Sequence, residues 1–257
     1  MSNPLGISVG LKNWSLLPEY AAAGIETVEI SLPGAPIDEL RLFASEAYAL
    51  LRKSGMSLWS VHLPFGRRLD ISATDESERA RVLGELRLSI DLARGLGAGT
   101  LIIHGSSEPN EDASRPARME ACARSLRELQ AYAGSMRLAV ENLPRTCIGR
   151  TGRETARLSE ACAGVCFDVN HLLIEEHDAF LDATEKRIIT THLSDYDRVN
   201  ERHWLPGMGV VPWKLVHDRL IAAGYEGPFL FELGLNADNE PYAPAEVVGA
   251  WKRLTGA

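Results

Sequence analysis

The chain has 257 residues, of which 45% are hydrophobic and 24% are charged, and this suits one domain with a large core. A net charge of −8 argues against a broad nucleic-acid-binding surface, and no apolar run approaches the length of a membrane span. The first residues, MSNPLGISVG, lack the charged and apolar regions of a secretory signal, so we expect a cytoplasmic protein whose four cysteines stay reduced.

Short apolar runs alternate with segments of helical spacing along the whole chain. The runs occupy residues 7–9, 27–30, 58–62, 100–104, 138–141, 165–168, 188–192 and 229–232. Between them, segments such as 76–98 and 117–134 carry apolar residues at helical intervals and stop near glycine, which predicts helices. Eight strand-helix units predict a (β/α)8 TIM barrel that forms a single domain over residues 1–257. A doubly wound open sheet is the alternative.

Six of the apolar runs end on a residue that can bind a metal. In chain order these residues are His62, His104, Glu141, Asp168, His192 and Glu232. A single such ending means little, because Asp is common where a strand gives way to a turn or a helix cap. In a barrel, however, the side chains at the C-terminal ends of the strands converge above the packed interior. We therefore expect these residues to surround one active-site mouth.

Four of the six residues form an oxygen-rich set of ligands. Glu141, Asp168 and Glu232 supply carboxylates, and His192 supplies an imidazole. Such a set suits Mn²⁺, Mg²⁺ or Co²⁺, and Zn²⁺ becomes more favourable as imidazoles are added. For each carboxylate alone, the alternative is a salt bridge at the barrel rim. Together the four residues predict a divalent metal ion as cofactor.

Three further residues and one glycine-rich stretch carry weaker signals. Glu29 stands one residue before the end of the second predicted strand and either touches the substrate or caps the barrel rim. His177 and His217 stand among charged residues in predicted helices, so we expect them to be solvated. The stretch RGLGAGT follows a helix and precedes a strand, which is the reverse of a dinucleotide-binding fingerprint, so we expect no nicotinamide cofactor.

Several short motifs together resemble a known superfamily. They are VHLPF, FDVNH, HLSDYDR, LPGMGVVPW and GYEGPFLFEL, and they are most specific over residues 164–233. The chain is similar to the xylose isomerase-like TIM barrel superfamily of sugar isomerases and epimerases, over almost its whole length. The resemblance implies a metal-dependent isomerase or epimerase that acts on a small sugar, a sugar phosphate or a polyol. We expect no membrane partner, because no apolar run is long enough to span one, and we leave open whether the chain forms a homo-oligomer.

The ketose 3-epimerase branch of that superfamily implies roles for individual residues. Its Glu, Asp, His and Glu metal ligands match Glu141, Asp168, His192 and Glu232. The two glutamates are then expected to move a proton on the carbon beside a substrate carbonyl, through an enediolate.

The same branch implies substrate-binding residues. A His three residues after the metal Asp and an Arg six residues after the metal His hold the substrate in that branch, and His171 and Arg198 stand at those offsets. His62 and His104 also stand at rim positions where sugar-active members carry histidines. We expect all four to contact substrate.

A rival interpretation comes from the apurinic endonuclease family, which shares this barrel and binds three zinc ions. The residues that align with its ligands are His62, His104, Glu141, Asp168, His171, His192, His203 and Glu232. Its Asp-Arg-His triplet appears here as Glu201-Arg202-His203, which departs at one ligand. The acidic balance and the five lysines of this chain disfavour phosphate-backbone binding. A lyase that acts on a related polyol or keto acid is a further alternative.

Overall fold

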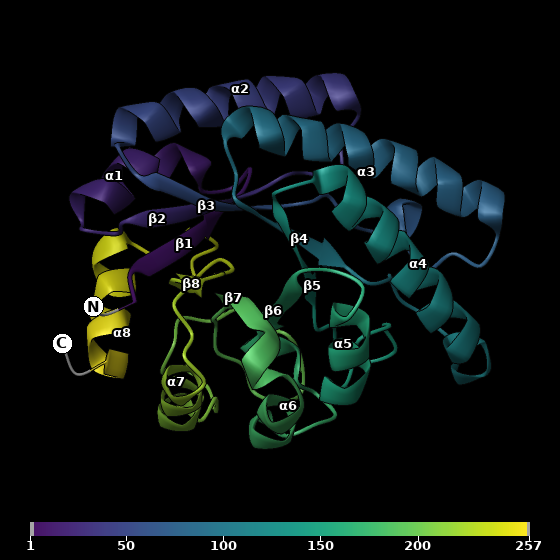
Figure 1. The fold of residues 1–257 in the computed structure, drawn as a ribbon. Helices are drawn as coiled ribbons and strands as arrows, with labels where there is room; N and C mark the ends of the chain where they lie inside the picture. Colours follow the sequence, from purple (N-terminus) through teal and green to yellow (C-terminus); the bar gives the residue numbers. More distant parts are fainter. Residues whose placement is uncertain (1–2, 256–257) are drawn as a thin grey trace.

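The computed structural model describes residues 3–255 and forms one barrel of parallel strands surrounded by helices (Figure 1). From β1 to β7, each strand pairs with the next strand in sequence, and β8 pairs with β1. The strands are β1 (Leu5–Val9), β2 (Thr27–Ser31), β3 (Ser57–His62), β4 (Thr100–His104), β5 (Arg137–Glu141), β6 (Gly164–Asp168), β7 (Ile188–His192) and β8 (Phe229–Phe231).

The barrel is nearly closed between β7 and β8. Leu193, just after β7, forms an isolated parallel bridge with Phe231, and its N–H donates to the carbonyl oxygen of Leu230 at 2.8 Å. The predicted single-domain (β/α)8 barrel is therefore confirmed, and the open-sheet alternative is wrong.

Helices follow the strands on the outside of the barrel (Figure 1). The α-helices are α1 (Leu17–Ala22), α2 (Ile37–Ser54), α3 (Glu76–Leu96), α4 (Arg115–Ala133), α5 (Gly152–Ser159), α6 (His177–Thr184), α7 (Trp213–Ala222) and α8 (Pro244–Thr255). The short 3-10 helices are η1 (Trp14–Leu16), η2 (Arg67–Leu69), η3 (Asp112–Ser114), η4 (Val169–His171) and η5 (Glu185–Arg187). Within residues 3–255, no helix combines the length and apolar content that crossing a membrane requires.

Side-chain chemistry sets the limits of helix α3. The side chain of Asp75 accepts a hydrogen bond from the N–H of Glu78 and so caps the first turn. Gly97 follows the last turn with φ of 84°, a left-handed conformation that glycine adopts without steric cost. The predicted glycine stop of this helix is confirmed.

In two neighbouring pairs of strands, the register places the C-terminal residues opposite each other. His104 on β4 lies opposite Glu141 on β5, and Asp168 on β6 lies opposite His192 on β7. All five residues of β6 are buried, as expected for a parallel strand covered on both faces. The polar residues that end these strands therefore meet above the apolar interior of the barrel.

The prediction that His177 is solvated is wrong. His177 begins α6, is only 2% exposed, and donates from Nε2 to the carbonyl oxygen of Val169 at 3.1 Å. Phe180, Leu181 and Thr184 of the same helix are also buried. These positions follow His177 at helical spacing, so His177 lies on the buried face of α6. The charged residues next to it in sequence lie on other faces of the helix and do not predict its exposure. His217 on α7 is partly exposed beside Asp218.

We predict that His177 makes the protein less stable in mild acid. Burial lowers the pKa of His177 to about 4 from 6.5, so between these values the unfolded chain takes up a proton that the folded chain does not. The free energy of unfolding should fall as pH drops from 6.5 towards 4, with a limiting contribution of about 3 kcal/mol. Urea denaturation of wild type and H177Q across this range measures it.

The H177Q protein should lose stability less steeply with falling pH than wild type, because Gln does not titrate. H217Q, which changes a partly exposed histidine, is the matched control and should follow wild type. Parallel curves for wild type and H177Q would contradict the prediction.

Candidate metal centre and active site

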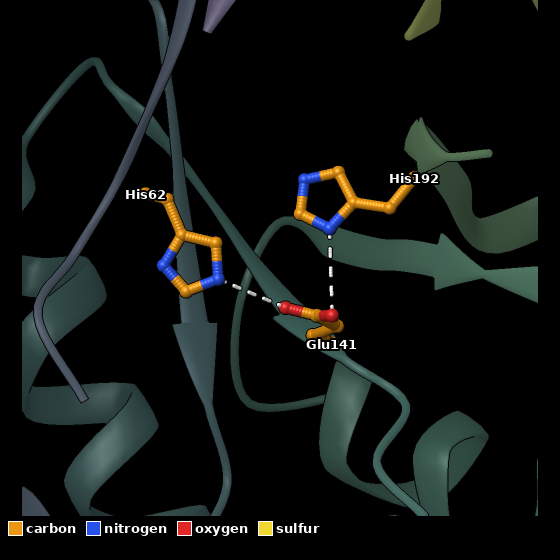
Figure 2. A group of neighbouring side chains, drawn as sticks. All are labelled: His62, Glu141 and His192. Atoms are coloured by element: carbon orange, nitrogen blue, oxygen red, sulfur yellow. Dashed lines mark hydrogen bonds and ion pairs between the residues drawn. The ribbon is translucent and has the colours of Figure 1, made fainter. Parts of the chain in front are cut away.

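The carboxylate of Glu141, at the end of β5, lies at the centre of the barrel mouth. Its Oε2 is 3.1 Å from Nε2 of His62 and 3.2 Å from Nε2 of His104. Its Oε1 is 3.4 Å from Nδ1 of both His171 and His192. Figure 2 shows the rings of His62 and His192 both directed at this carboxylate. Glu141 is 1% exposed, so these contacts are made away from bulk water.

The four residues predicted as metal ligands lie together. Glu141, Asp168, His192 and Glu232 each offer one atom, and these atoms are all within 4.8 Å of one another. Nδ1 of His192 is 3.3 Å from Oε2 of Glu232, which links the end of β7 to the residue after β8. A single divalent ion could therefore contact all four side chains.

Asp168 provides an independent test of whether a cation fits. Its Oδ1 accepts the N–H of Asn170 at 2.6 Å, whereas its buried Oδ2 has no hydrogen-bond partner among residues 3–255. Burial raises the pKa of Asp168 well above its ordinary value, and the charges of Glu141 and Glu232 raise it further. A buried carboxylate oxygen without a partner is unfavourable, and a cation would both satisfy it and favour its ionised form. The donor set fits a divalent ion.

The charged groups around Asp168 affect one another strongly. Burial alone would raise the pKa of Glu141, but the adjacent His104 and His192 hold it well below its ordinary value. Burial alone would lower the pKa of His192, but neighbouring anionic groups, including Glu232 and Glu29, hold it well above its ordinary value. The mouth is thus an electrostatically coupled cluster of carboxylates and imidazoles.

His62 is part of a second, overlapping group. His62, Glu141 and His192 also offer donor atoms within 4.8 Å of one another. Nδ1 of His62 lies 2.8 Å from the carbonyl oxygen of Leu63, which leaves Nε2 facing Glu141. Metal-binding histidines commonly donate their second ring nitrogen to a backbone carbonyl in this way. His104 faces the same carboxylate oxygen, and burial lowers its pKa. These residues form a second candidate set of metal ligands that shares Glu141 and His192 with the first.

His171 and His203 line the same region. Nδ1 of His171 is 2.9 Å from the carbonyl oxygen of Asn142 and 3.5 Å from Oδ2 of Asp168. The His203 ring packs edge-on against that of His171, and its Nδ1 is 3.8 Å from Oε2 of Glu232. The loop between β7 and α7 therefore adds an imidazole to the residues predicted from strand ends.

Arg198 is the one predicted site residue that lies apart from this cluster. Its guanidinium forms an ion pair with Glu176 and donates to the carbonyl oxygen of Glu175 at 3.1 Å. Arg198 does not line either of the two cavities at the barrel mouth. In this conformation its side chain is directed to the loop between β6 and α6, so its predicted contact with substrate would require movement.

Two adjoining cavities open at the barrel mouth. One, of about 350 Å³, is lined by His62, His104, Glu141, His171 and Glu232, among others. The other, of about 540 Å³, lies over the ends of β1 and β2 and shares Phe65, His203 and Glu232 with the first. Their size is in the range of small-molecule sites. Glu232 borders both, and its side chain is 25% exposed.

Asparagine and aspartate side chains that the sequence did not single out support the site. Asn142 clamps the end of β6: its Nδ2 donates to the carbonyl oxygen of Asp168, and its Oδ1 accepts the N–H of Asp168, both at 2.8 Å. Asn142 directly follows Glu141, but an Asn after a strand is also an ordinary turn residue. No sequence signal therefore separated this role from a turn.

Asp195 organises the loop that carries His203. Its carboxylate accepts the N–H groups of Tyr196, Gly207 and Val211 and the indole N–H of Trp213, at 2.8 to 3.0 Å. A Cβ on Gly209 would lie 2.2 Å from the carbonyl oxygen of Tyr196 and 2.5 Å from Oδ1 of Asp195. Asp195 and Gly209 occur within the HLSDYDR and LPGMGVVPW motifs, which were the available signal.

The fold and the site together define a class of protein. A (β/α)8 barrel whose strand ends bring carboxylates and imidazoles to a cavity at its C-terminal face is the architecture of TIM-barrel enzymes with a metal-ligand cluster. The chain belongs to the family described as Xylose isomerase-like TIM barrel, which it matches over residues 17–251. The resemblance predicted from the motifs is thereby confirmed.

Known proteins similar to this chain include one curated relative and many solved structures. The relative, Uncharacterized protein y4fM of Sinorhizobium fredii (strain NBRC 101917 / NGR234), is 29% identical over 160 residues, which are 57% of this chain and 51% of the relative. The match thus spans about half the length of that relative.

Two of the similar structures carry epimerase names. A D-tagatose 3-epimerase-like protein has a TM-score of 0.78 at 18% identity, covering 97% of this chain and 96% of its own. The 3-keto-D-glucoside 4-epimerase YcjR from E. coli has a TM-score of 0.75 at 18% identity, covering 98% of this chain and all (100%) of its own. At these identities the likeness concerns the fold.

We predict that the protein binds a divalent ion and that D168N weakens this binding. Asn keeps an oxygen at the position of Asp168 but removes the negative charge, so affinity should fall at least about 100-fold. Elemental analysis of the purified protein, followed by Mn²⁺ and Co²⁺ titrations after chelator treatment, measures the effect. D218N, which neutralises an exposed aspartate on α7, should bind as wild type does. Equal affinity in D168N and D218N would contradict the prediction.

Proposed function

We propose that this protein is a divalent-metal-dependent isomerase or epimerase of small sugars or sugar phosphates that works by proton transfer. The observation that carries the proposal is the set of Glu141, Asp168, His192 and Glu232 donor atoms within 4.8 Å of one another, at the edge of a cavity of about 350 Å³. The family membership and the epimerase names of similar structures agree with it.

The four ligand residues would hold the metal next to the substrate oxygens. A divalent ion there supplies Lewis-acid polarisation of a carbonyl, which lowers the cost of removing a proton from the adjacent carbon. His62, His104 and His171 all line the cavity, so we assign them to the substrate hydroxyls. Arg198 would join them only after leaving Glu176.

Of the two proposed bases, Glu232 is the one with better access to a substrate. Burial would raise its pKa, but His192 and His203 bring it below its ordinary value, so the carboxylate is ionised at neutral pH. It also borders both cavities and is partly exposed. A base needs both the ionised form and access to the proton that it removes.

Glu141 is proposed as the second base, on the opposite side of the substrate. It comes from β5, three strands away from β8 around the barrel in chain order, and it lines the smaller cavity. Its carboxylate is ionised but is enclosed by histidines. Removal of a proton by one glutamate gives an enediolate, and delivery of a proton to the other face by the second gives the epimer.

A zinc-dependent phosphodiesterase of the apurinic endonuclease type is the second candidate. The group of His62, Glu141 and His192, with His104 nearby, favours it because more than one ion could be held. Against it, Glu201, which replaces the Asp of that family's Asp-Arg-His triplet, forms an ion pair with Arg145. A lyase on a related polyol or keto acid would use the same proton abstraction and is tested with the same assay.

We predict that the metal-loaded protein exchanges a carbon-bound proton of a ketose with solvent. A panel of ketoses and ketose phosphates incubated in heavy water should gain deuterium at carbon 3 or a neighbouring carbon, measured by NMR and mass spectrometry. Net loss of water from the substrate would indicate the lyase. Abasic DNA should remain uncut, and its cleavage without sugar exchange would replace the proposal with the endonuclease candidate.

We predict that E232Q and E141Q each reduce turnover by about 10²- to 10⁴-fold, the usual contribution of a general base, while keeping measurable metal. With one base gone, exchange of the proton that faces the surviving base can continue although net epimerisation stops. Deuterium exchange measured separately for each epimer reveals this. E240Q, a change at an exposed glutamate after β8, is the control. Near-normal epimerisation in metal-loaded E232Q and E141Q would refute the two-base mechanism and leave the sugar assignment standing.

A further inference from the structure

Glu29 is a buried carboxylate that no step of the proposed reaction uses. It lies on β2, is 0% exposed, and points into the barrel. Its Oε1 accepts the hydroxyl of Ser8 on β1 at 3.0 Å, and its Oε2 accepts the hydroxyl of Ser60 on β3 at 2.6 Å. The two neighbouring strands thus fix the orientation of the carboxylate. Glu29 lines neither of the two cavities described at the barrel mouth, and its contacts are with neighbouring strands and with His192.

The third contact of Glu29 is with His192. Nε2 of His192 is 2.9 Å from Oε1 of Glu29, while Nδ1 of the same ring is 3.3 Å from Glu232 and 3.4 Å from Glu141. Both partners are fully buried. The two ring nitrogens therefore face different surroundings: one faces a fixed acceptor, and the other faces the ligand cluster. The Nδ1 contact with Glu141 is drawn in Figure 2.

The chemistry of the pair determines which nitrogen carries hydrogen. Both oxygens of Glu29 already accept hydroxyl hydrogens, so in the contact with His192 the Nε2 atom donates and Oε1 of Glu29 accepts. In the neutral ring, Nδ1 then has a free lone pair directed at the cluster, and this is the form that a metal needs. Carboxylates that accept the distal N–H of a histidine commonly orient it as a ligand and increase its basicity.

We propose that Glu29 is a positioning residue for the metal centre: by accepting the Nε2 hydrogen of His192, and held in turn by Ser8 and Ser60, it presents Nδ1 of His192 to the ion. The inference rests on the metal site of the proposed function. It extends that site by one layer, to β1, β2 and β3, which contribute none of the four proposed ligands.

Metal affinity tests this role without measuring activity. E29L removes the acceptor, and its affinity for Zn²⁺, measured by competition with a chromophoric chelator, should fall about 10- to 100-fold. E29Q keeps an amide oxygen that can accept from Nε2, so it should recover a large part of the loss. E26Q is the matched control: it makes the same chemical change as E29Q at an exposed residue just before β2. It should bind Zn²⁺ as wild type does. Thermal unfolding of the metal-free variants reports whether each is folded.

The protonated nitrogen of His192 gives a second readout that a merely structural role would not produce. In zinc-loaded protein labelled with ¹⁵N-histidine, long-range proton-nitrogen NMR should show His192 protonated at Nε2 and bound at Nδ1. H192Q assigns the signal. If E29L does not fold, E29Q and S60A are compared instead, and a smaller loss of affinity with a shifted Nε2–H signal is expected in both.

The outcomes separate this inference from the proposed function. The role of Glu29 is overturned, and the proposed function stays intact, in either of two cases in which wild type binds zinc. In the first, E29L binds zinc with the wild-type affinity. In the second, His192 binds zinc through Nε2. No zinc binding in wild type overturns the metal site and, with it, the role of Glu29. Reduced affinity in E29L, partial recovery in E29Q and a zinc-bound Nδ1 together support it.

Discussion

The enclosure of one carboxylate, Glu141, by four imidazoles is the interaction on which the barrel mouth depends. His62, His104, His171 and His192 approach it from four different segments of the chain, at 3.1 to 3.4 Å. Buried charges are unfavourable unless they are paired, so the ends of these segments must be held accurately. The parallel pairing of the strands supplies this accuracy, because the register fixes where the end of each strand lies relative to its neighbours.

A layer of polar side chains below and beside this carboxylate completes the arrangement. Asn142 clamps the backbone at Asp168, Asp195 gathers the loop that carries His203, and Glu29 holds the far nitrogen of His192. The contacts of Asn142 and Glu29 join separate strands, whereas those of Asp195 fold a single loop. The side chains of the barrel mouth are therefore positioned by hydrogen bonds that leave the cavity itself open.

Sequence patterns predicted much of this site because barrel strands are short and their ends are marked. A buried apolar run that stops on His62 or Glu141 identifies both the strand and the face from which the side chain emerges. The pattern was less informative in helices and loops. His177 looked solvated because its sequence neighbours are charged, and Arg198 matched a substrate-binding offset although its guanidinium here contacts Glu176. Offsets along a loop do not determine where a side chain points.

By itself, the sequence determined the order of the strands, the (β/α)8 barrel and the last residue of all strands except β2 and β8, since these follow from local periodicity and the connection rules of parallel sheets. The partners of those residues were decided only by the tertiary structure. Register and packing between β1, β2, β3 and β7 decide which oxygen of Glu141 faces each histidine. They also bury Glu29 against Ser8, Ser60 and His192. Such contacts join residues far apart in the chain, and no local pattern records them.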